Sequence, residues 1–352
     1  MNSSIQNSTA SETEIESDGQ KIFQYFLYIF NGVSASVGSS LIIFVILRNR
    51  ELRCKDYYLL CGLAGGDACQ AVAFLYSGIR RMMLVIAQRD ESVLVTPWEC
   101  MLEFYNTFFL FGQECSMMMT FCLSLDRFLA IHSFTQYRNY GTRYALIMIA
   151  CVYAHCTVVV VVGWYTSYFV VAQEPIYPLI CFTPYAVPTL YYSYHGLAQL
   201  IPGLGSITLY VSALVLAAKS TSNSVAPSLT SVQLAERRRQ AQLTKNIAIV
   251  VFYTFFSTTV PFGVVFFLNT LGLKTSSTFS VIAPYMWAVT CFDGGMNIFI
   301  YARKYPKFRS YLKQLFHIKT DDNKVVAIVQ VQTSNTAPSG KKMGLQQRTT
   351  HI

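Results

Sequence analysis

The chain has 352 residues, of which 53% are hydrophobic and 13% are charged, and its formal net charge is +9. A soluble domain carries about 25% charged residues, so this composition leaves too little polar surface for a soluble enzyme. The Lys and Arg residues stand in short clusters between long apolar runs rather than along one continuous face, which argues against a nucleic-acid-binding protein. The composition therefore predicts a membrane protein with several spans.

Seven stretches are long and apolar enough to cross a bilayer as helices, since a span needs about 20 residues. They cover residues 22–47, 57–79, 101–131, 144–170, 191–218, 247–271 and 279–301. The loops after the first, third and fifth spans and the C-terminal tail hold 22 of the 27 Lys and Arg residues, when Arg127 at the end of the third span is counted with them. By the positive-inside rule these segments are cytoplasmic. The predicted fold is an all-α seven-transmembrane helix bundle with its N-terminus outside.

Three regions follow from this pattern: an extracellular tail at 1–21, a seven-helix domain at 22–316, and a disordered cytoplasmic tail at 317–352. Two N-x-S/T sequons, at Asn2 and Asn7, predict glycosylation of the outer tail, and Asn7 is favoured because Asn2 is close to the end. Residues 306–316 place apolar side chains on one helical face with Lys and Arg beside them. This predicts a short amphipathic helix lying on membrane lipids.

Polar residues recur at particular depths of the spans, where they are costly and usually functional. Asp67 lies in the second span, and Asp126 precedes Arg127 at the cytoplasmic end of the third. The fifth span contains Pro202 with Tyr210, the sixth Phe255 six residues before Pro261, and the seventh Asn297 with Tyr301. A chain with these features in this order resembles the rhodopsin-like (class A) G-protein-coupled receptors, over about residues 22–316.

The resemblance implies a switch that couples the bundle to a heterotrimeric G protein. In the family, the carboxylate at the position of Asp126 restrains the neighbouring arginine, here Arg127, which contacts the G protein when released. Proline residues remove backbone hydrogen bonds and so allow bending. The residues assigned to this switch are Asp126, Arg127, Tyr210, Phe255, Pro261, Asn297 and Tyr301. Ala241 replaces an acid that pairs with the arginine in some members, which predicts an altered cytoplasmic lock.

A second group is Asp67, Ser116, Asp293 and Asn297. Asp67, Ser116 and Asn297 match the family's mid-membrane sodium pocket, and Asp293 lies one turn above Asn297 on the same face, where many members have Asn. The resemblance implies an allosteric sodium ion there, and the alternative is a protonated, hydrogen-bonded pair of acids without an ion. Cys100 and Cys181 match the family's outer disulfide, although Cys100 lies two residues farther from Arg127 than is usual.

The ligand is expected in the outer half of the bundle. Phe109 stands where aminergic receptors have an aspartate, and Cys291 where opsins have their lysine, so neither a biogenic amine nor retinal is expected. The residues predicted to line the ligand site are Phe109, Gln113, Glu114, Met117, Tyr285 and Trp287; the alternative is that they are core or lipid-facing residues.

The drifted motifs, with Thr259 and Ile298 at usual Trp and Pro positions, resemble nematode serpentine chemoreceptors of the srsx-like branch. That branch implies a small-molecule receptor of sensory neurons, in the plasma membrane and in sensory cilia. Further expected partners are arrestin at the Ser/Thr-rich tail and a PDZ-domain protein at Thr350–Ile352.

Two other functions remain open at this point. A neuropeptide receptor of the same superfamily would share every motif above. A ligand-gated channel or ion-coupled transporter would use Asp67 and Asp293 as an ion relay, but it would leave the Asp126–Arg127 pair without a role. The sequence shows no nucleophile–base pairing and no metal-ligand spacing, so we expect no enzyme.

Overall fold

The computed structural model describes residues 18–88, 93–171, 173–222, 231–270 and 277–317. Six helical runs in this part are long and apolar enough to cross a membrane, and α11 is the seventh helix of the bundle, which confirms the predicted fold. The sixth run consists of α9, the π-helical segment η2 and α10. The seven are α1 (Asp18–Arg48), α2 (Lys55–Ile86), α4 (Phe104–His132), α6 (Thr142–Phe169), α8 (Thr189–Ser222), α9–η2–α10 (Ser231–Thr254, Phe255–Thr259, Val260–Thr270) and α11 (Ser277–Lys304).

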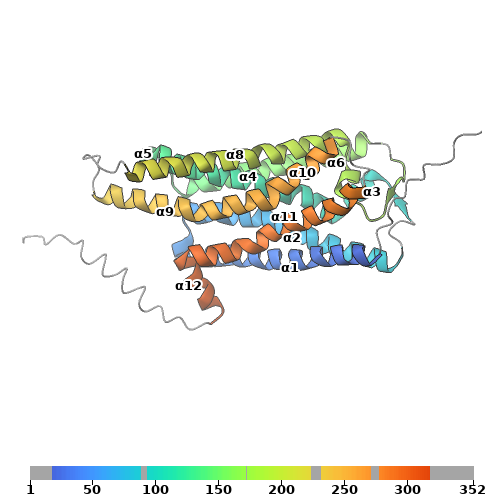
Figure 1. Cartoon of the computed structure of the whole chain (residues 1–352), viewed down its shortest axis with the longest axis horizontal. Helices are drawn as coiled ribbons and strands as arrows, with labels where there is room; N and C mark the ends of the chain where they lie inside the picture. The colour runs from blue at the N-terminus through green and yellow to red at the C-terminus, as the bar shows by residue number, and fades with distance from the viewer. Residues whose placement is uncertain (1–17, 89–92, 172, 223–230, 271–276, 318–352) are drawn as a thin grey trace, which may run out of the picture.

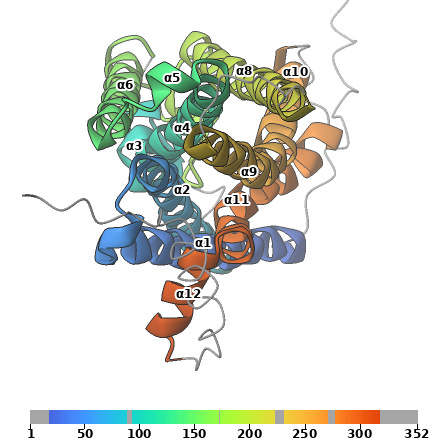
Figure 2. The same cartoon turned by 90° about the vertical axis from the view of Figure 1, so that its left-hand side faces the viewer.

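The seven runs lie side by side along the long axis of the molecule (Figure 1). Seen along the helices, α4 lies in the middle of the bundle (Figure 2), where it packs against α2, α6, α8 and α9. Small residues let the helices approach closely, as is common in membranes. A Cβ atom at Gly112 of α4 would lie 2.5 Å from the backbone nitrogen of Gln70 in α2, and one at Gly32 of α1 would lie 2.6 Å from that of Leu75.

The third span begins later than predicted. A separate helix, α3 (Pro97–Leu102), precedes it. The Thr96 side chain accepts a hydrogen bond from the Glu99 backbone N–H, and the Glu99 side chain accepts one from the Thr96 backbone N–H. This capping box makes Thr96 the N-cap of α3, with Pro97 as the first helical residue. Glu103 then adopts an extended backbone, so the span starts at Phe104 rather than at residue 101. This break lies between Cys100 and Arg127.

Two further predicted boundaries change. α1 begins at Asp18, four residues before the predicted first span, and α2 continues to Ile86. The sequence placed Arg80 and Arg81 in an outer loop, but both belong to α2, and Arg81 is buried. α2 therefore remains helical beyond the end of the apolar stretch, and Ala87 is its C-cap residue.

The sixth helix changes geometry next to Pro261. Proline cannot donate to the carbonyl four residues earlier, and its ring crowds that carbonyl. The turn before it widens into η2, and the helix resumes as α10 at Val260. Such π-helical turns mark kinks in long helices. The predicted weak point in the sixth span is therefore present as a local change of helix type.

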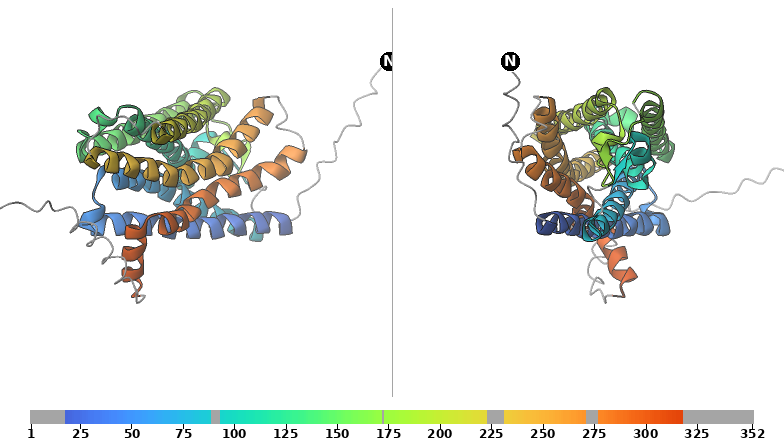
Figure 3. Two further views of the ribbon diagram at one scale, coloured as in Figure 1. Left: turned by 60° about the vertical axis from the view of Figure 1, so that its left-hand side comes forward. Right: turned by 90° about the vertical axis from the view of Figure 1, so that its right-hand side faces the viewer.

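The remaining elements sit at the two ends of the bundle. At the cytoplasmic end, α12 turns away from α11 (Figure 3) and confirms the amphipathic helix, with Phe308 buried and Lys307 exposed. At the outer end, β1 (Leu94–Val95) pairs antiparallel with β2 (Tyr177–Pro178). The others are η1 (Arg50–Leu52), α5 (Phe134–Tyr137), α7 (Thr183–Ala186) and α12 (Pro306–Leu315). Asn2, Asn7, Thr350 and the tail after His317 lie outside the described residues.

Candidate functional site

Arg127 is the centre of a buried cluster at the cytoplasmic end of α4. Its Nε atom donates to Asp126 Oδ2 at 2.9 Å, and its Nη2 atom donates to the same oxygen and, at 2.5 Å, to Asp56 Oδ1. The side chains of Arg127 and Asp126 are fully buried. The predicted pair is therefore formed, and Asp56 in the first turn of α2 adds a second carboxylate that the sequence analysis missed.

Tyr137 of α5 closes this cluster. Its hydroxyl accepts from Arg127 Nη2 at 2.9 Å and donates to Asp126 Oδ2 at 3.1 Å. Burial raises the pKa of the Tyr137 phenol, so it remains protonated and able to donate. Lys55 anchors the other face, with its Nζ atom 3.4 Å from the centre of the Tyr137 ring. Tyr137 comes from a short connecting helix and Lys55 from the first turn of α2, and no sequence motif marks either residue.

The sixth helix contacts the cluster through Gln240 rather than Ala241. Arg127 Nη1 donates to Gln240 Oε1 at 3.4 Å, a long contact to an uncharged acceptor. Tyr210 of α8 donates to the backbone carbonyl of Thr244 in α9, which ties the fifth helix to the sixth. Tyr301 is buried, and its hydroxyl has no hydrogen-bond partner among the described residues. The arrangement restrains Arg127 by two charges and holds α9 only weakly.

The mid-membrane group also comes together. Asp67 accepts from Ser116 Oγ at 2.5 Å and from Asn297 Nδ2 at 3.0 Å, one donor on each carboxylate oxygen. Asp293 lies one turn before Asn297 on α11, close enough to Asp67 for the two charges to interact, and next to the η2 hydroxyls. The four predicted residues therefore form one buried polar layer.

Several oxygens of this layer lack hydrogen-bond partners among the described residues. They are Asp293 Oδ1, Asn297 Oδ1 and Ser39 Oγ, and all are buried. A buried polar atom without a partner is costly, and oxygen ligands are what hard cations prefer. The residues present therefore offer oxygen ligands of the kind that would suit a small hard cation.

The outer half of the bundle encloses a small cavity of about 60 Å³. Among the predicted ligand residues, Phe109, Gln113 and Trp287 line it, whereas Glu114, Met117 and Tyr285 do not. Glu114 instead points to His155 at 3.3 Å and His195 at 3.4 Å. The lining consists of Tyr28, Phe74, Arg81, Phe109, Leu110, Gln113, Phe182, Thr183, Pro184, Tyr192, His195, Phe262 and Trp287.

Glu114 and Met117 miss the cavity because of the direction in which α4 turns. Phe109 and Gln113 are four residues apart on one face, and Glu114 follows on the side of α6 and α8. Met117 lies deeper, and its methyl group would contact a Cβ at Gly203 of α8 at 2.7 Å. His195 lines the cavity as well. The sequence did not predict this, because a single histidine in an apolar span does not reveal which side of the helix faces the cavity.

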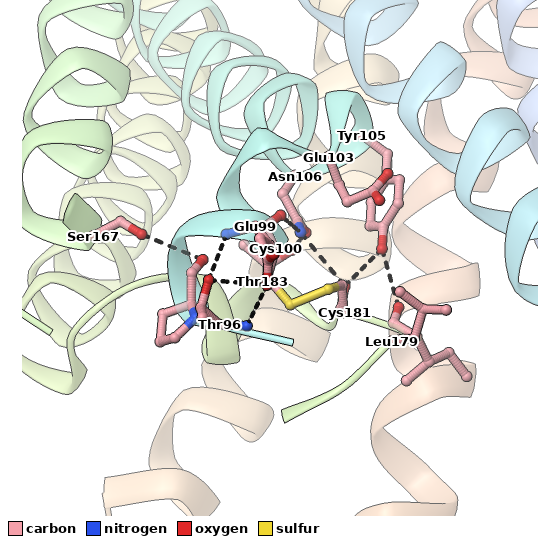
Figure 4. Close-up of a disulfide and its surroundings, with 12 residues drawn as sticks. Thr96, Glu99, Cys100, Glu103, Tyr105, Asn106, Ser167, Leu179, Cys181 and Thr183 are labelled. Carbon is pink, nitrogen blue, oxygen red and sulfur yellow. Dashed lines mark hydrogen bonds between the residues drawn. A yellow bond between two sulfur atoms is a disulfide. The ribbon is translucent and has the colours of Figure 1, made fainter. Parts of the chain in front are cut away.

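A loop covers the outer side of the cavity and is held by the predicted disulfide. Cys100 of α3 is bonded to Cys181, with Cα atoms 5.2 Å apart, which confirms that pair (Figure 4). Tyr105 donates to the Cys181 carbonyl at 2.9 Å, and Asn106 links Cys100 to Thr183 through hydrogen bonds at 2.7 and 2.8 Å. The lid residues Phe182, Thr183 and Pro184 are therefore fixed against the bundle.

Comparison with known proteins agrees with this architecture. Residues 38–301 match the family described as 7 transmembrane receptor (rhodopsin family). The chain therefore belongs to the rhodopsin family of seven-transmembrane receptors, whose members are receptors rather than enzymes. Among solved structures it is similar to squid rhodopsin, with 18% identity over 92% of this chain and 94% of that chain and a TM-score of 0.69. At this identity the likeness concerns the fold alone.

Proposed function

We propose that this receptor binds a small molecule in the outer cavity and activates a heterotrimeric G protein at the cytoplasmic end. Family membership implies a ligand and a G protein as partners. The observation that carries the assignment of the switch is Arg127, fully buried and bonded to both Asp126 and Asp56. A receptor at rest needs such a restraint, and release of a planar, permanently charged guanidinium creates a surface for a partner helix.

The outer cavity and the cytoplasmic cluster around Arg127 are connected through the sixth helix, which can bend at η2. The cavity is lined by Phe262 of α10, directly after η2, and α9 holds the cytoplasmic contacts of Gln240 and Thr244. A ligand that shifts α10 at η2 also shifts α9, because all three form one helical run. Hinge-like bending of this kind is a recognised route for coupling distant sites. Phe255 and Pro261 lie at that hinge.

The chemosensory role is also a proposal. A covered cavity with aromatic walls suits a small molecule, because small-ligand sites are mostly apolar with a few polar groups. We place the receptor in the plasma membrane, including that of sensory cilia. Arrestin and a PDZ-domain protein remain proposed partners of the C-terminal tail.

We further propose that Asp67, Ser116, Asp293 and Asn297 hold a sodium ion. The three unpartnered oxygens of that layer support the proposal. A bound cation would neutralise part of the negative charge of the two carboxylates and stabilise the resting packing around them. No retinal is proposed, because Cys291 stands at the position that matches the opsin lysine.

The experiment is a G-protein dissociation assay in cells that express the receptor. Cells are challenged with size-fractionated extracts before and after protease treatment, and Arg127→Ala cells are the uncoupled control. A low-mass, protease-resistant agonist whose signal disappears in the control supports the proposal. A protease-sensitive agonist supports a neuropeptide receptor, and an ion current that survives Arg127→Ala without a G protein would show that the switch is misassigned.

A further inference from the structure

Arg81 is a buried cation on the wall of the outer cavity. It is 3% exposed, and its Nε and Nη2 atoms donate to the backbone carbonyls of Ile180 and Cys181, each at 3.1 Å. The guanidinium lies 5.0 Å from the ring centre of Tyr105 and 4.4 Å from that of Phe182. Among the residues that the structure describes, no carboxylate forms an ion pair with it.

Among the described residues, two carboxylates at the outer end of the bundle already have partners. Glu103 is paired with Arg80, and Glu99 is used by the Thr96 cap. Burial raises the pKa of Glu103, although Arg80 and Arg81 act in the opposite direction. Two arginines therefore face one carboxylate, and the uncompensated charge is the one that lines the cavity.

Leaving a buried charge without a counter-charge is expensive unless hydrogen bonds or a ligand compensate it. Two carbonyl oxygens and two aromatic faces reduce the cost at Arg81 but supply no negative charge. His195 also lines the cavity, and its Nδ1 atom lies 3.4 Å from Glu114 Oε2, so this part of the lining already has a carboxyl group beside it.

We infer that the ligand of this receptor is a small organic acid with an aromatic or apolar body, whose carboxylate pairs with Arg81. This inference rests on the proposed ligand site and specifies its chemistry. The body of the ligand packs against Phe74, Phe109, Phe262 and Trp287, which line the cavity. Arginine suits the acid because its planar fork can donate two parallel hydrogen bonds to a carboxylate.

Arg81 could instead serve only to hold the lid, and this role predicts a different result. A comparison with Arg80 distinguishes the lid-holding role from the ligand-anchoring role. Arg80 also holds the lid, since its Nη1 atom donates to the Leu179 carbonyl at 3.1 Å, but its charge is matched by Glu103. If holding the lid were the whole role, Arg80→Gln and Arg81→Gln would affect ligand binding alike. If Arg81 is the anchor of an acid, only Arg81→Gln loses the preference for the charged group.

The test uses purified full-length receptor in lipid nanodiscs and needs no G protein. The probes are phenylacetate, 3-phenylpropionate, indole-3-acetate and octanoate, each compared with its primary amide, and the readout is the concentration dependence of the melting temperature. At least one acid is expected to stabilise the wild type while its amide does not. Loss of a hydrogen bond to a charged group corresponds to roughly 10- to 150-fold weaker binding in Arg81→Gln, with Arg80→Gln within about threefold of wild type.

Arg81→Lys retains the charge and is expected to recover part of the acid binding, which separates loss of the anchor from misfolding. The inference is overturned if amides stabilise the receptor as well as acids, if no acid in the panel shifts the melting temperature, or if Arg81→Gln binds the acid as tightly as Arg80→Gln. Basal nucleotide exchange on a G protein is measured separately, in the wild type and in Arg127→Ala. Acid binding without any exchange would refute the G-protein function and leave the ligand class standing.

Discussion

The contact between Asp56 and Arg127 offers a direct test of the resting state. Asp56 is an acceptor 2.5 Å from Arg127 Nη2, and its side chain is 14% exposed. The change Asp56→Asn keeps the shape and removes the charge. Arg127 keeps Asp126 as its counter-charge, so the variant is expected to fold. The contact is lost only from the resting state, because Arg127 must leave both carboxylates in order to reach a G protein.

The expected size of the effect follows from the type of bond. A hydrogen bond to a charged group contributes about 1.5–3 kcal/mol, which is roughly a 10- to 150-fold change in the equilibrium between resting and active receptor. For a receptor that is about 1% active without ligand, Asp56→Asn would raise that fraction to about 10–60%. The assay is ligand-free nucleotide exchange on a panel of heterotrimeric G proteins, with the receptor in nanodiscs at matched density.

Glu51→Gln is the matched control. Glu51 is also an acidic residue at the cytoplasmic end, but its pair with Lys307 is exposed, with side chains 64% and 68% accessible. Exposed pairs contribute little, so its basal exchange should equal that of the wild type. Equal basal exchange in Asp56→Asn and the wild type would refute the view that a second carboxylate restrains Arg127.

Two other predictions concern the membrane core. Replacing Na⁺ by choline at constant ionic strength should lower the melting temperature of the wild type, and Asp67→Asn should remove this sodium dependence; an equal sodium effect in both proteins would place the ion elsewhere. Gly112→Ala should destabilise the folded bundle by about 1–3 kcal/mol, because the new Cβ would lie 2.5 Å from the Gln70 backbone nitrogen. Gly141→Ala, with nothing within 4 Å, should melt like the wild type in a thermal denaturation assay, and a matching loss in both variants would contradict the packing argument.

Part of the geometry of the candidate sites was predictable, because it depends on the spacing of residues within single helices. The pairs Asp126–Arg127 and Asp293–Asn297 each lie on one helix, so the helical repeat alone orders their members along the bundle. Asp67, Ser116 and Asn297 come from three helices, and the resemblance to a known family is what predicted their meeting. The disulfide between Cys100 and Cys181 was predicted on the same basis.

Contacts made by connecting segments were not predictable. Asp56 and Tyr137 reach Arg127 from a helix end and a four-residue helix, and Gln240 rather than Ala241 faces it. The sequence also placed Glu114 and Met117 at the cavity, although both turn away from it. A one-residue step rotates a side chain by about 100° around a helix, so spacing that is uncertain by one residue cannot decide which neighbour a side chain meets.

By itself, the sequence predicted seven membrane spans, and the charges of its loops predicted which end is cytoplasmic. Hydrophobic length and charge asymmetry decide these properties, and both are local along the chain. Only the tertiary structure decided that Arg81 is buried at the cavity and that Asp56 shares Arg127. Burial and pairing depend on how helices rotate and where loops fold back, which is settled by packing between segments far apart in the chain.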